Sequence, residues 1–418
     1  MISTALLLKV VVASSTSVAR VALVMLAGVV LSRRSILTGS ARRSIAELST
    51  YCLLPALLFL KVSAAVSRAG PQILHWLVLP AYSLFHCFLG LSLGTAACRA
   101  RRWWRGGEAA HRPRPVFSPM TSADMEDVEL GEDAEDDADE ALLEALVLMC
   151  AAFPNSGGLP LALVDALCSS SAQRILGGED CLDATVGYVS FYIAVMNPLQ
   201  WFICPRLLRT NRGEALVSAD AAAKEPAAAP ATGWRACGAA VGRALKTLAP
   251  PVWGAVTGAA LGAIPGARDA VLGKAEAPTV LGGAVALVSA AAVPVGIINL
   301  GGSVASKMGK GDGSVSMPWS LVAIALALRL AVVPVISSGV TIALRRLAVV
   351  PRADPALSLV LFLESTPPPA MQCMIFCQLF SQAAERPLGK VLVAQYGASL
   401  ATLTAWIALF LTLLGQDE

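Results

Sequence analysis

Long apolar segments alternate with short polar ones along this chain of 418 residues. Ten apolar segments approach the roughly 20 residues that an α-helix needs to cross the hydrocarbon core of a bilayer. They form two sets of five, so we expect a first repeat at 1–208, a linker at 209–247 and a second repeat at 248–418. The predicted spans are 5–31, 45–66, 73–98, 141–168 and 185–208, then 248–264, 279–305, 319–344, 356–381 and 388–414.

The fourth and ninth predicted spans are interrupted at their centres. The fourth contains Ala-Ala-Phe-Pro-Asn-Ser-Gly-Gly-Leu-Pro at 151–160, and the ninth contains Ser-Thr-Pro-Pro-Pro-Ala-Met-Gln at 365–372. Backbone groups that are unpaired inside a membrane must bind to protein or to a polar cavity, so paired breaks predict a binding site. We therefore predict an all-α integral membrane protein. Its ten transmembrane helices form two inverted five-helix repeats, with broken, crossing helices four and nine.

Composition agrees with a membrane protein and argues against other classes. Hydrophobic residues make up 56% of the chain and charged residues only 15%, whereas charged residues reach about 25% in soluble proteins. The net charge of +3 is small, and no basic face with stacking aromatic residues indicates nucleic acid as a partner. The chain contains neither a His-Glu-x-x-His motif nor a Walker-type phosphate loop. We therefore expect no enzyme activity, no metal and no cofactor.

Lys and Arg are far more numerous in loops that follow odd-numbered spans than in loops that follow even-numbered ones. Because basic loops stay in the cytosol, we expect both termini to be non-cytosolic. The cytosolic loop at 99–140 is basic at its start and acidic from Asp124 to Glu140, a composition that predicts disorder. Cys168 and Cys181 flank a non-cytosolic loop, where a disulfide could form in an oxidising lumen.

The candidate substrate-binding residues are polar or helix-breaking groups at the two breaks or in the seventh span. Asn155 lies where half-helix N-termini present N–H donors, which suits a carboxylate. Neighbouring glycines would let a substrate approach the main chain closely. Three successive prolines in the second break lack N–H donors, so we expect their carbonyl groups to be free for a ligand, a cation or water. The full set is Asn155, Gly157, Gly158, Pro160, Asn299, Pro367, Pro368, Pro369 and Gln372.

Several ionisable residues lie inside predicted spans, where such residues are rare and commonly functional, and two of them are the main candidates for a functional role. Glu364, three residues before the triple proline, could bind or relay a proton. Arg329 could pair with Glu364 or attract an anion. The alternative for both is an internal ion pair, and for Asn155 and Gln372 it is ordinary hydrogen bonding between helices.

Four stretches of the sequence resemble the PIN-LIKES branch of the auxin efflux carrier family. They are Leu-Ala-Pro-Pro-Val-Trp-Gly-Ala-Val-Thr-Gly at 248–258, Val-Pro-Val-Gly-Ile-Ile-Asn-Leu-Gly-Gly-Ser at 293–303, Gly-Leu-Pro-Leu at 158–161 and Pro-Pro-Ala-Met-Gln at 368–372. The resemblance implies transport of indole-3-acetate or a similar weak organic acid in the endoplasmic reticulum membrane. It also implies that the two broken helices cross at the substrate site, within an elevator-like transport domain.

The chain departs from the residues that are frequent in that family. Gly158 and Ser303 each stand where the family often has asparagine. Gln372 also replaces an asparagine, and Glu364 replaces a glutamine. These exchanges alter the hydrogen-bonding groups available at the expected site.

The leading hypothesis is a secondary transporter of a small organic anion, embedded in the lipid bilayer and working by alternating access at the crossing helices. One alternative is a proton- or sodium-coupled carrier of another solute, with Glu364 as the coupling group. Another is a non-transporting membrane receptor or sensor that signals through the acidic part of the 99–140 loop. The sequence leaves the substrate, the coupling ion and formation of a homodimer open.

Overall fold

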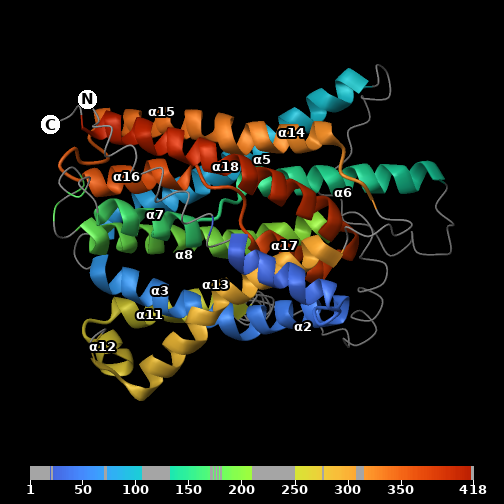
Figure 1. The fold of residues 1–418 in the computed structure, drawn as a ribbon. Coiled ribbons are helices and arrows are strands. Elements are labelled where there is room, and N and C mark those ends of the chain that lie inside the picture. The colour runs from blue at the N-terminus through green and yellow to red at the C-terminus, as the bar shows by residue number, and fades with distance from the viewer. Residues whose placement is uncertain are drawn as a thin grey trace, which may run out of the picture.

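The computed structural model of the protein describes residues 19, 22–69, 73–105, 132–169, 173, 176, 178, 181–209, 250–274, 277–306 and 315–415. Within these residues the chain is almost entirely helical, and most of the long helices run side by side along one direction (Figure 1). The elements are helix Ala22–Arg33, α2 (Gly39–Leu48), η1 (Ser49–Leu53), α3 (Leu54–Ala69), α4 (Ile73–Trp76), α5 (Val78–Arg105), α6 (Glu132–Ala152), α7 (Gly158–Cys168), α8 (Cys181–Arg209), α11 (Pro250–Ala263), α12 (Ala267–Leu272), β1 (Gly273–Lys274), β2 (Ala277–Pro278), α13 (Val280–Ser306), α14 (Trp319–Ala327), η6 (Leu328–Val332), α15 (Val333–Arg346), α16 (Pro355–Glu364), α17 (Gln372–Phe380), η7 (Gln382–Ala384) and α18 (Glu385–Leu414).

Four continuous helices in the described part of the chain are long and apolar enough to cross a membrane, and a bent pair of helices would make a fifth. The bent pair, Gln382–Ser399 with Ala401–Leu414, turns by 46°. The number is below the expected ten partly because the fourth and ninth predicted spans are each divided into two shorter helices, and because α11 has only 14 residues. The four continuous helices are Gly39–Arg68, Val78–Arg105, Val280–Ser303 and Trp319–Arg346.

The predicted loop at 99–140 differs from the structure at both ends, because α5 continues to Arg105 and α6 begins at Glu132. Two ion pairs join α5 to α6 here, and the first links the two extensions. Arg101 Nη1 lies 2.8 Å from Glu140 Oε1, and Arg102 Nε lies 3.2 Å from Glu144 Oε1. The basic end of α5 thus complements the acidic start of α6, a pairing that composition alone does not reveal. The rest of this loop, 106–131, and the linker from 210 to 249 lie outside the described residues.

The helices form two groups, and each group contains helices from both halves of the chain. We call helix Ala22–Arg33, α2, η1, α3, α11, α12 and α13 the frame group, and α4–α8 with α14–α18 the crossover group. In Figure 1 the blue α2 and α3 lie beside the yellow α11, α12 and α13 at the bottom, below the green, orange and red helices. The groups meet where α8 packs on α3 and α11, and where α17 and α18 pack on α2 and α13.

Within the frame group, α3 and α11 form the most extensively packed helix pair. A Cβ atom on Gly254 would lie 2.3 Å from the Pro55 carbonyl oxygen, and one on Gly258 would lie 2.6 Å from that of Phe59. A third glycine four residues further on repeats the contact. Spacing of four residues places these glycines on one face of α11, so the two backbones touch directly, as in other tightly packed membrane helices.

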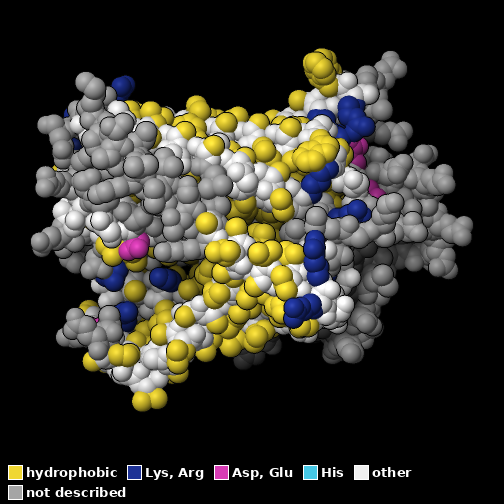
Figure 2. All heavy atoms as spheres, viewed as in Figure 1, with side chains coloured by type: hydrophobic (Ala, Val, Ile, Leu, Met, Phe, Trp, Pro, Cys, Tyr) yellow, Lys and Arg dark blue, Asp and Glu magenta, His cyan; other side chains and the backbone are white. Residues whose placement is uncertain are grey.

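Cys168 and Cys181, for which the sequence left a disulfide open, do form one, and it joins the end of α7 to the start of α8. Apolar side chains cover the middle of the outer surface, whereas Lys and Arg gather toward its two ends (Figure 2). Val280 and Leu287 of α13 are 94% and 77% exposed. Large exposed apolar areas of this kind are unusual in soluble proteins, and they match a protein surrounded by lipid tails.

Candidate functional site

The two interrupted segments meet inside the crossover group and pair with each other. Pro154 and Pro369 form an isolated antiparallel β-bridge. The Asn155 N–H donates to the Pro368 carbonyl oxygen at 2.8 Å. The Ala370 N–H donates to the Phe153 carbonyl oxygen at 2.9 Å. Each break therefore satisfies backbone groups of the other, which lipid could not do. We call these paired segments, 153–157 and 365–371, the crossover.

Four helix ends adjoin the crossover. The C-terminal ends of α6 and α16 lead into it, and the N-terminal ends of α7 and α17 lead out of it. No side chain at the N-cap position of α7 or α17 forms a capping hydrogen bond. At α17 the N–H groups of Cys373 and Met374 donate to backbone carbonyl oxygens of Ala370 and Met371. Helix N-termini carry partial positive charge, so both ends favour an anion at the crossover.

The opposing C-terminal ends are held by Arg329, a fully buried residue in the π-helical turn η6. Its Nε donates to the Pro367 carbonyl oxygen at 2.7 Å. Its Nη2 donates to the carbonyl oxygens of Ser365 at 3.1 Å and Glu364 at 3.3 Å. Its Nη1 donates to the Ala151 carbonyl oxygen at 3.4 Å. Arg329 therefore joins the ends of α6 and α16 and offsets their negative partial charges. We expected an ion pair with the Glu364 carboxylate or a site for an external anion, but backbone carbonyl groups occupy the guanidinium.

Each of the three proline carbonyl groups in the second break accepts a hydrogen bond from the protein. Two of them receive the Arg329 and Asn155 donors described above, and the Pro369 carbonyl oxygen receives the Tyr396 hydroxyl at 3.0 Å. We expected these carbonyl groups to be free for a ligand, and the structure shows them holding the break in place. The reason is burial, because every residue from Ser365 to Ala370 is buried and a buried carbonyl group needs a donor.

Asn155 is half-buried, and its amide is oriented by Tyr396 of α18. The Asn155 Nδ2 donates to the Tyr396 hydroxyl at 2.8 Å, and that hydroxyl donates in turn to Pro369. Tyr396 thus contacts both breaks. The sequence gives no local sign of this role, because Tyr396 lies 241 residues from Asn155 in an otherwise apolar helix.

The other predicted residues of the two breaks lie at the helix starts. Gly157 is half-buried, and a Cβ atom there would lie 3.8 Å from Ile193 Cδ1, so space remains beside it. Gly158 begins α7, and Pro160 is buried in the first turn of that helix. Gln372 begins α17 half-buried, and its Oε1 has no hydrogen-bond partner among the described residues.

Glu364 is the last residue of α16 and is fully buried. Neither of its carboxyl oxygens forms a hydrogen bond of normal geometry with another residue that the structure describes. The Ser156 hydroxyl and the Arg329 guanidinium are its polar neighbours. A charged carboxylate is costly in such a position, so Glu364 retains hydrogen-bonding capacity that the fold does not use.

Asn299 does not lie at the crossover. It belongs to α13 of the frame group, and its Nδ2 donates to Gln378 Oε1 at 2.7 Å and to the Arg42 carbonyl oxygen at 3.4 Å. Gln378 lies six residues beyond Gln372 on α17, or about 9 Å along the helix axis. Asn299 thus lies in the seventh predicted span, as expected, but apart from the two breaks, and its role in binding a substrate stays a prediction. It lies apart from the breaks because α13 runs through its internal proline without a break and packs outside the crossing helices.

The sequence of the crossover region matches that of known proteins. Residues 139–407, which include both breaks, match the sequence model of the membrane transport protein family. The chain is 25% identical to PIN-LIKES 5 of Arabidopsis thaliana over 299 residues, which cover 65% of this chain and 74% of that protein. It is 27% identical to PIN-LIKES 3 over 293 residues, 65% of this chain and 73% of that protein, from the same plant.

A third relative from Arabidopsis thaliana, PIN-LIKES 1, is 24% identical over 286 residues. That match covers 65% of this chain and 59% of PIN-LIKES 1, which is less than two thirds of its length. The relatives agree with the family match, which extends over more than half of the chain. The protein is an integral membrane protein and belongs to the membrane transport protein family, that of the auxin efflux carriers.

Proposed function

We propose that the protein is a secondary transporter of a small organic anion, with indole-3-acetate or a similar weak acid as the leading candidate. The observation that carries the proposal is the charge arrangement of the four helix ends. Arg329 offsets the negative ends of α6 and α16, whereas the positive ends of α7 and α17 have no capping side chain. The balance of partial charge at the crossover is therefore positive, which favours a carboxylate.

The groups best placed to meet the anion are half-buried amides and a half-buried glycine at or next to the crossover. They are Asn155 and Gly157 in the first break and Gln372, the residue that follows the second break. Tyr396 and Arg329 act indirectly, because they orient Asn155 and the second break. The triple proline contributes shape through its buried backbone rather than open carbonyl groups.

The proposed architecture follows the sequence expectation of ten membrane-spanning helices in two inverted repeats, 1–208 and 248–418. Alternating access would then move the crossover group against the frame group, since these groups contact each other along a limited set of helices. An endoplasmic reticulum membrane and non-cytosolic termini are part of the proposal, based on the resemblance to PIN-LIKES proteins and on the distribution of basic loops.

The proposal is tested with purified protein in lipid vesicles, using radiolabelled indole-3-acetate and benzoate. We expect saturable uptake that empty vesicles lack. Asn155→Ala should lower the uptake efficiency at least about tenfold, equivalent to about 1.4 kcal/mol. Asn197→Ala is the matched control, because it removes a buried amide from α8 outside both breaks. Equal uptake by wild type and Asn155→Ala would remove the crossover as the substrate site.

The same assay separates the alternatives, for which the unpaired Glu364 carboxyl group is the relevant observation. Uptake that depends steeply on a pH or sodium gradient, and loses that dependence in Glu364→Gln, would indicate a coupled carrier. Uptake that ignores both gradients would indicate transport driven by the substrate alone. Saturable binding without any flux would favour the receptor or sensor.

A further inference from the structure

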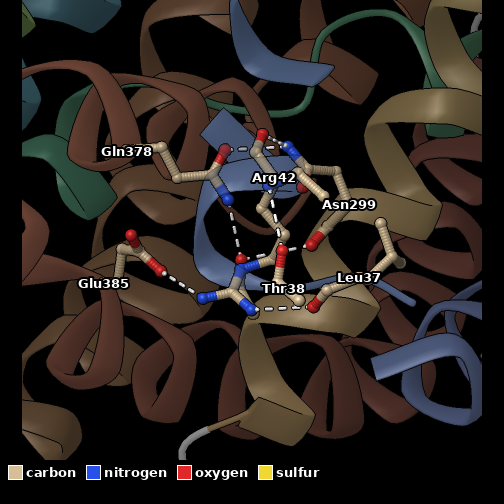
Figure 3. Close-up of polar contacts among 8 residues, drawn as sticks. Leu37, Thr38, Arg42, Asn299, Gln378 and Glu385 are labelled. Atoms are coloured by element: carbon tan, nitrogen blue, oxygen red, sulfur yellow. Dashed lines mark hydrogen bonds and ion pairs between the residues drawn. The ribbon is translucent and has the colours of Figure 1, made fainter. Parts of the chain in front are cut away.

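A second buried polar cluster lies between the two helix groups, away from the crossover. Its charged part is an ion pair in which Arg42 Nη2 lies 3.6 Å from Glu385 Oε2 (Figure 3). The two side chains are only 6% and 8% exposed. Arg42 Nη1 also donates to the Leu37 carbonyl oxygen at 3.3 Å.

The neutral part of the cluster is a chain of amide and hydroxyl groups. Asn299 Nδ2 donates to Gln378 Oε1 at 2.7 Å, and Gln378 Nε2 donates to Ser303 Oγ at 2.7 Å. The Ser303 hydroxyl donates back to the Asn299 carbonyl oxygen at 3.1 Å. Figure 3 shows the Gln378 and Asn299 side chains pointing toward each other beside Arg42.

The members of this cluster are divided between the two groups. Arg42 belongs to α2, and Asn299 and Ser303 belong to α13, all in the frame group. Gln378 belongs to α17, and Glu385 begins α18, both in the crossover group. The ion pair and two of the hydrogen bonds therefore join the groups, and any relative movement of the groups at this place must break them.

The position of the cluster relates it to the crossover. Along α17 and into α18 it extends from Gln378, six residues after Gln372, to Glu385, thirteen residues after Gln372. It therefore lies between the crossover and the end of the molecule where α2 and α18 begin. A solute that moves between the crossover and that end along this part of the interface would have to pass these side chains.

Two buried polar atoms in the cluster have no hydrogen-bond partner among the described residues, namely Arg42 Nε and Asn299 Oδ1. A buried network that serves only stability is expected to satisfy every member. A buried ion pair is also weak support for stability, and its best-established use is to specify one arrangement of elements over another. Both features fit a contact that forms and breaks better than a permanent one.

We propose that Arg42, Asn299, Ser303, Gln378 and Glu385 form a gate, which closes the path between the crossover and the α2/α18 end and opens when the two groups separate. The inference rests on the proposed transport function. When the gate opens, its polar side chains lose their hydrogen bonds to one another, bind water instead and line a hydrophilic passage. The loose 3.6 Å ion pair makes this exchange inexpensive.

The first test locks the gate with Arg42→Cys/Glu385→Cys and a short, reducible bifunctional thiol reagent in vesicles. Cross-linking should reduce indole-3-acetate uptake to that of protein-free vesicles, and reduction should restore it. Arg101→Cys/Glu140→Cys is the matched control, because that ion pair joins α5 to α6 inside the crossover group. Treated wild-type protein and the single-cysteine variants control for the native thiols. Full cross-linking at 42 and 385 with unchanged uptake would overturn the gate.

The second test does not depend on flux, so it separates failure of the gate from failure of the proposed function. Hydrogen exchange is measured by mass spectrometry in residues 39–48 and 372–388. Glu385→Gln should accelerate exchange there several-fold, and the swap Arg42→Glu/Glu385→Arg should return it toward the wild-type rate. The swap Arg101→Glu/Glu140→Arg should leave these two segments unchanged. Either of two results would overturn the gate even if transport is observed. One is a wild-type exchange rate in Glu385→Gln. The other is an exchange rate in the swap as fast as in Arg42→Glu or Glu385→Arg alone.

Discussion

The two breaks that form the crossover are unequal. The first exposes part of Asn155 and Gly157, and its backbone forms two hydrogen bonds with the other break. The second is buried from Ser365 to Ala370 and is held by Arg329 and Tyr396 as well. Under the proposed function, the second break would be a fixed support and the first would present groups to the ligand.

Proline chemistry explains this inequality. Three successive prolines cannot donate hydrogen bonds, so they contribute only acceptors to a buried region. Every one of those acceptors needs a donor from elsewhere in the fold. Arg329 supplies one from η6 and Tyr396 another from α18, so the second break is fastened to two additional elements. Variants that remove the Arg329 or Tyr396 hydrogen bonds one residue at a time test this difference between the two breaks.

Arg329→Gln should have the largest effect, on stability. The variant loses hydrogen bonds to four carbonyl groups at the ends of α6 and α16. We expect unfolding to become easier by about 3–5 kcal/mol, the range typical of removing one partner from a buried charged contact. Chemical denaturation in detergent micelles measures this loss. Arg346→Gln, at the exposed end of α15, is the control and should be neutral. Wild-type stability in Arg329→Gln would mean that the second break does not need this support.

Tyr396→Phe should have an intermediate effect, and mainly on substrate affinity. Removing its hydroxyl frees the Asn155 amide and leaves the Pro369 carbonyl group without its donor. Tyr82→Phe is the matched control, since the Tyr82 hydroxyl also makes two buried hydrogen bonds, but to α15 residues outside the crossover. Both variants should lose about 1 kcal/mol of stability.

Uptake kinetics then distinguish the two tyrosine variants. The KM for the transported acid should rise several-fold in Tyr396→Phe and stay near the wild-type value in Tyr82→Phe. Equal KM values in both variants would show that Tyr396 supports the fold without positioning Asn155.

Gly157→Ala should have the smallest effect. The added Cβ would lie at an ordinary contact distance of 3.8 Å from Ile193 Cδ1, and the Gly157 backbone has a φ of −102°, which alanine adopts easily. We expect stability within about 0.5 kcal/mol of wild type and a KM change smaller than that of Tyr396→Phe. A complete loss of uptake in a stable Gly157→Ala protein would mean that the ligand touches the backbone there. The first break would then be as tightly constrained as the second.

The outline of the fold and the place of the crossover were predictable because both depend on local sequence. Apolar length predicts the helices, and prolines with glycines predict where two of them are interrupted. The partners of Arg329, Asn155 and Asn299 were not predictable, because they depend on which distant segments pack together. Asn155 binds a side chain 241 residues away, and Asn299 binds one 79 residues away. Helix propensity and charge patterns carry no information about such contacts.

The triple proline also restricts which backbone atoms can pair at all. Elsewhere, two short antiparallel strands could slip by two residues and form equivalent hydrogen bonds. In this case the two bridged residues, Pro154 and Pro369, both lack an N–H group, and the residues that follow them, Asn155 and Ala370, supply the two donors. A slip by two residues toward Thr366 would put Pro368, which has no N–H group, at the donor position that Ala370 now occupies. The chain therefore excludes that register through a position at which hydrogen bonding is forbidden.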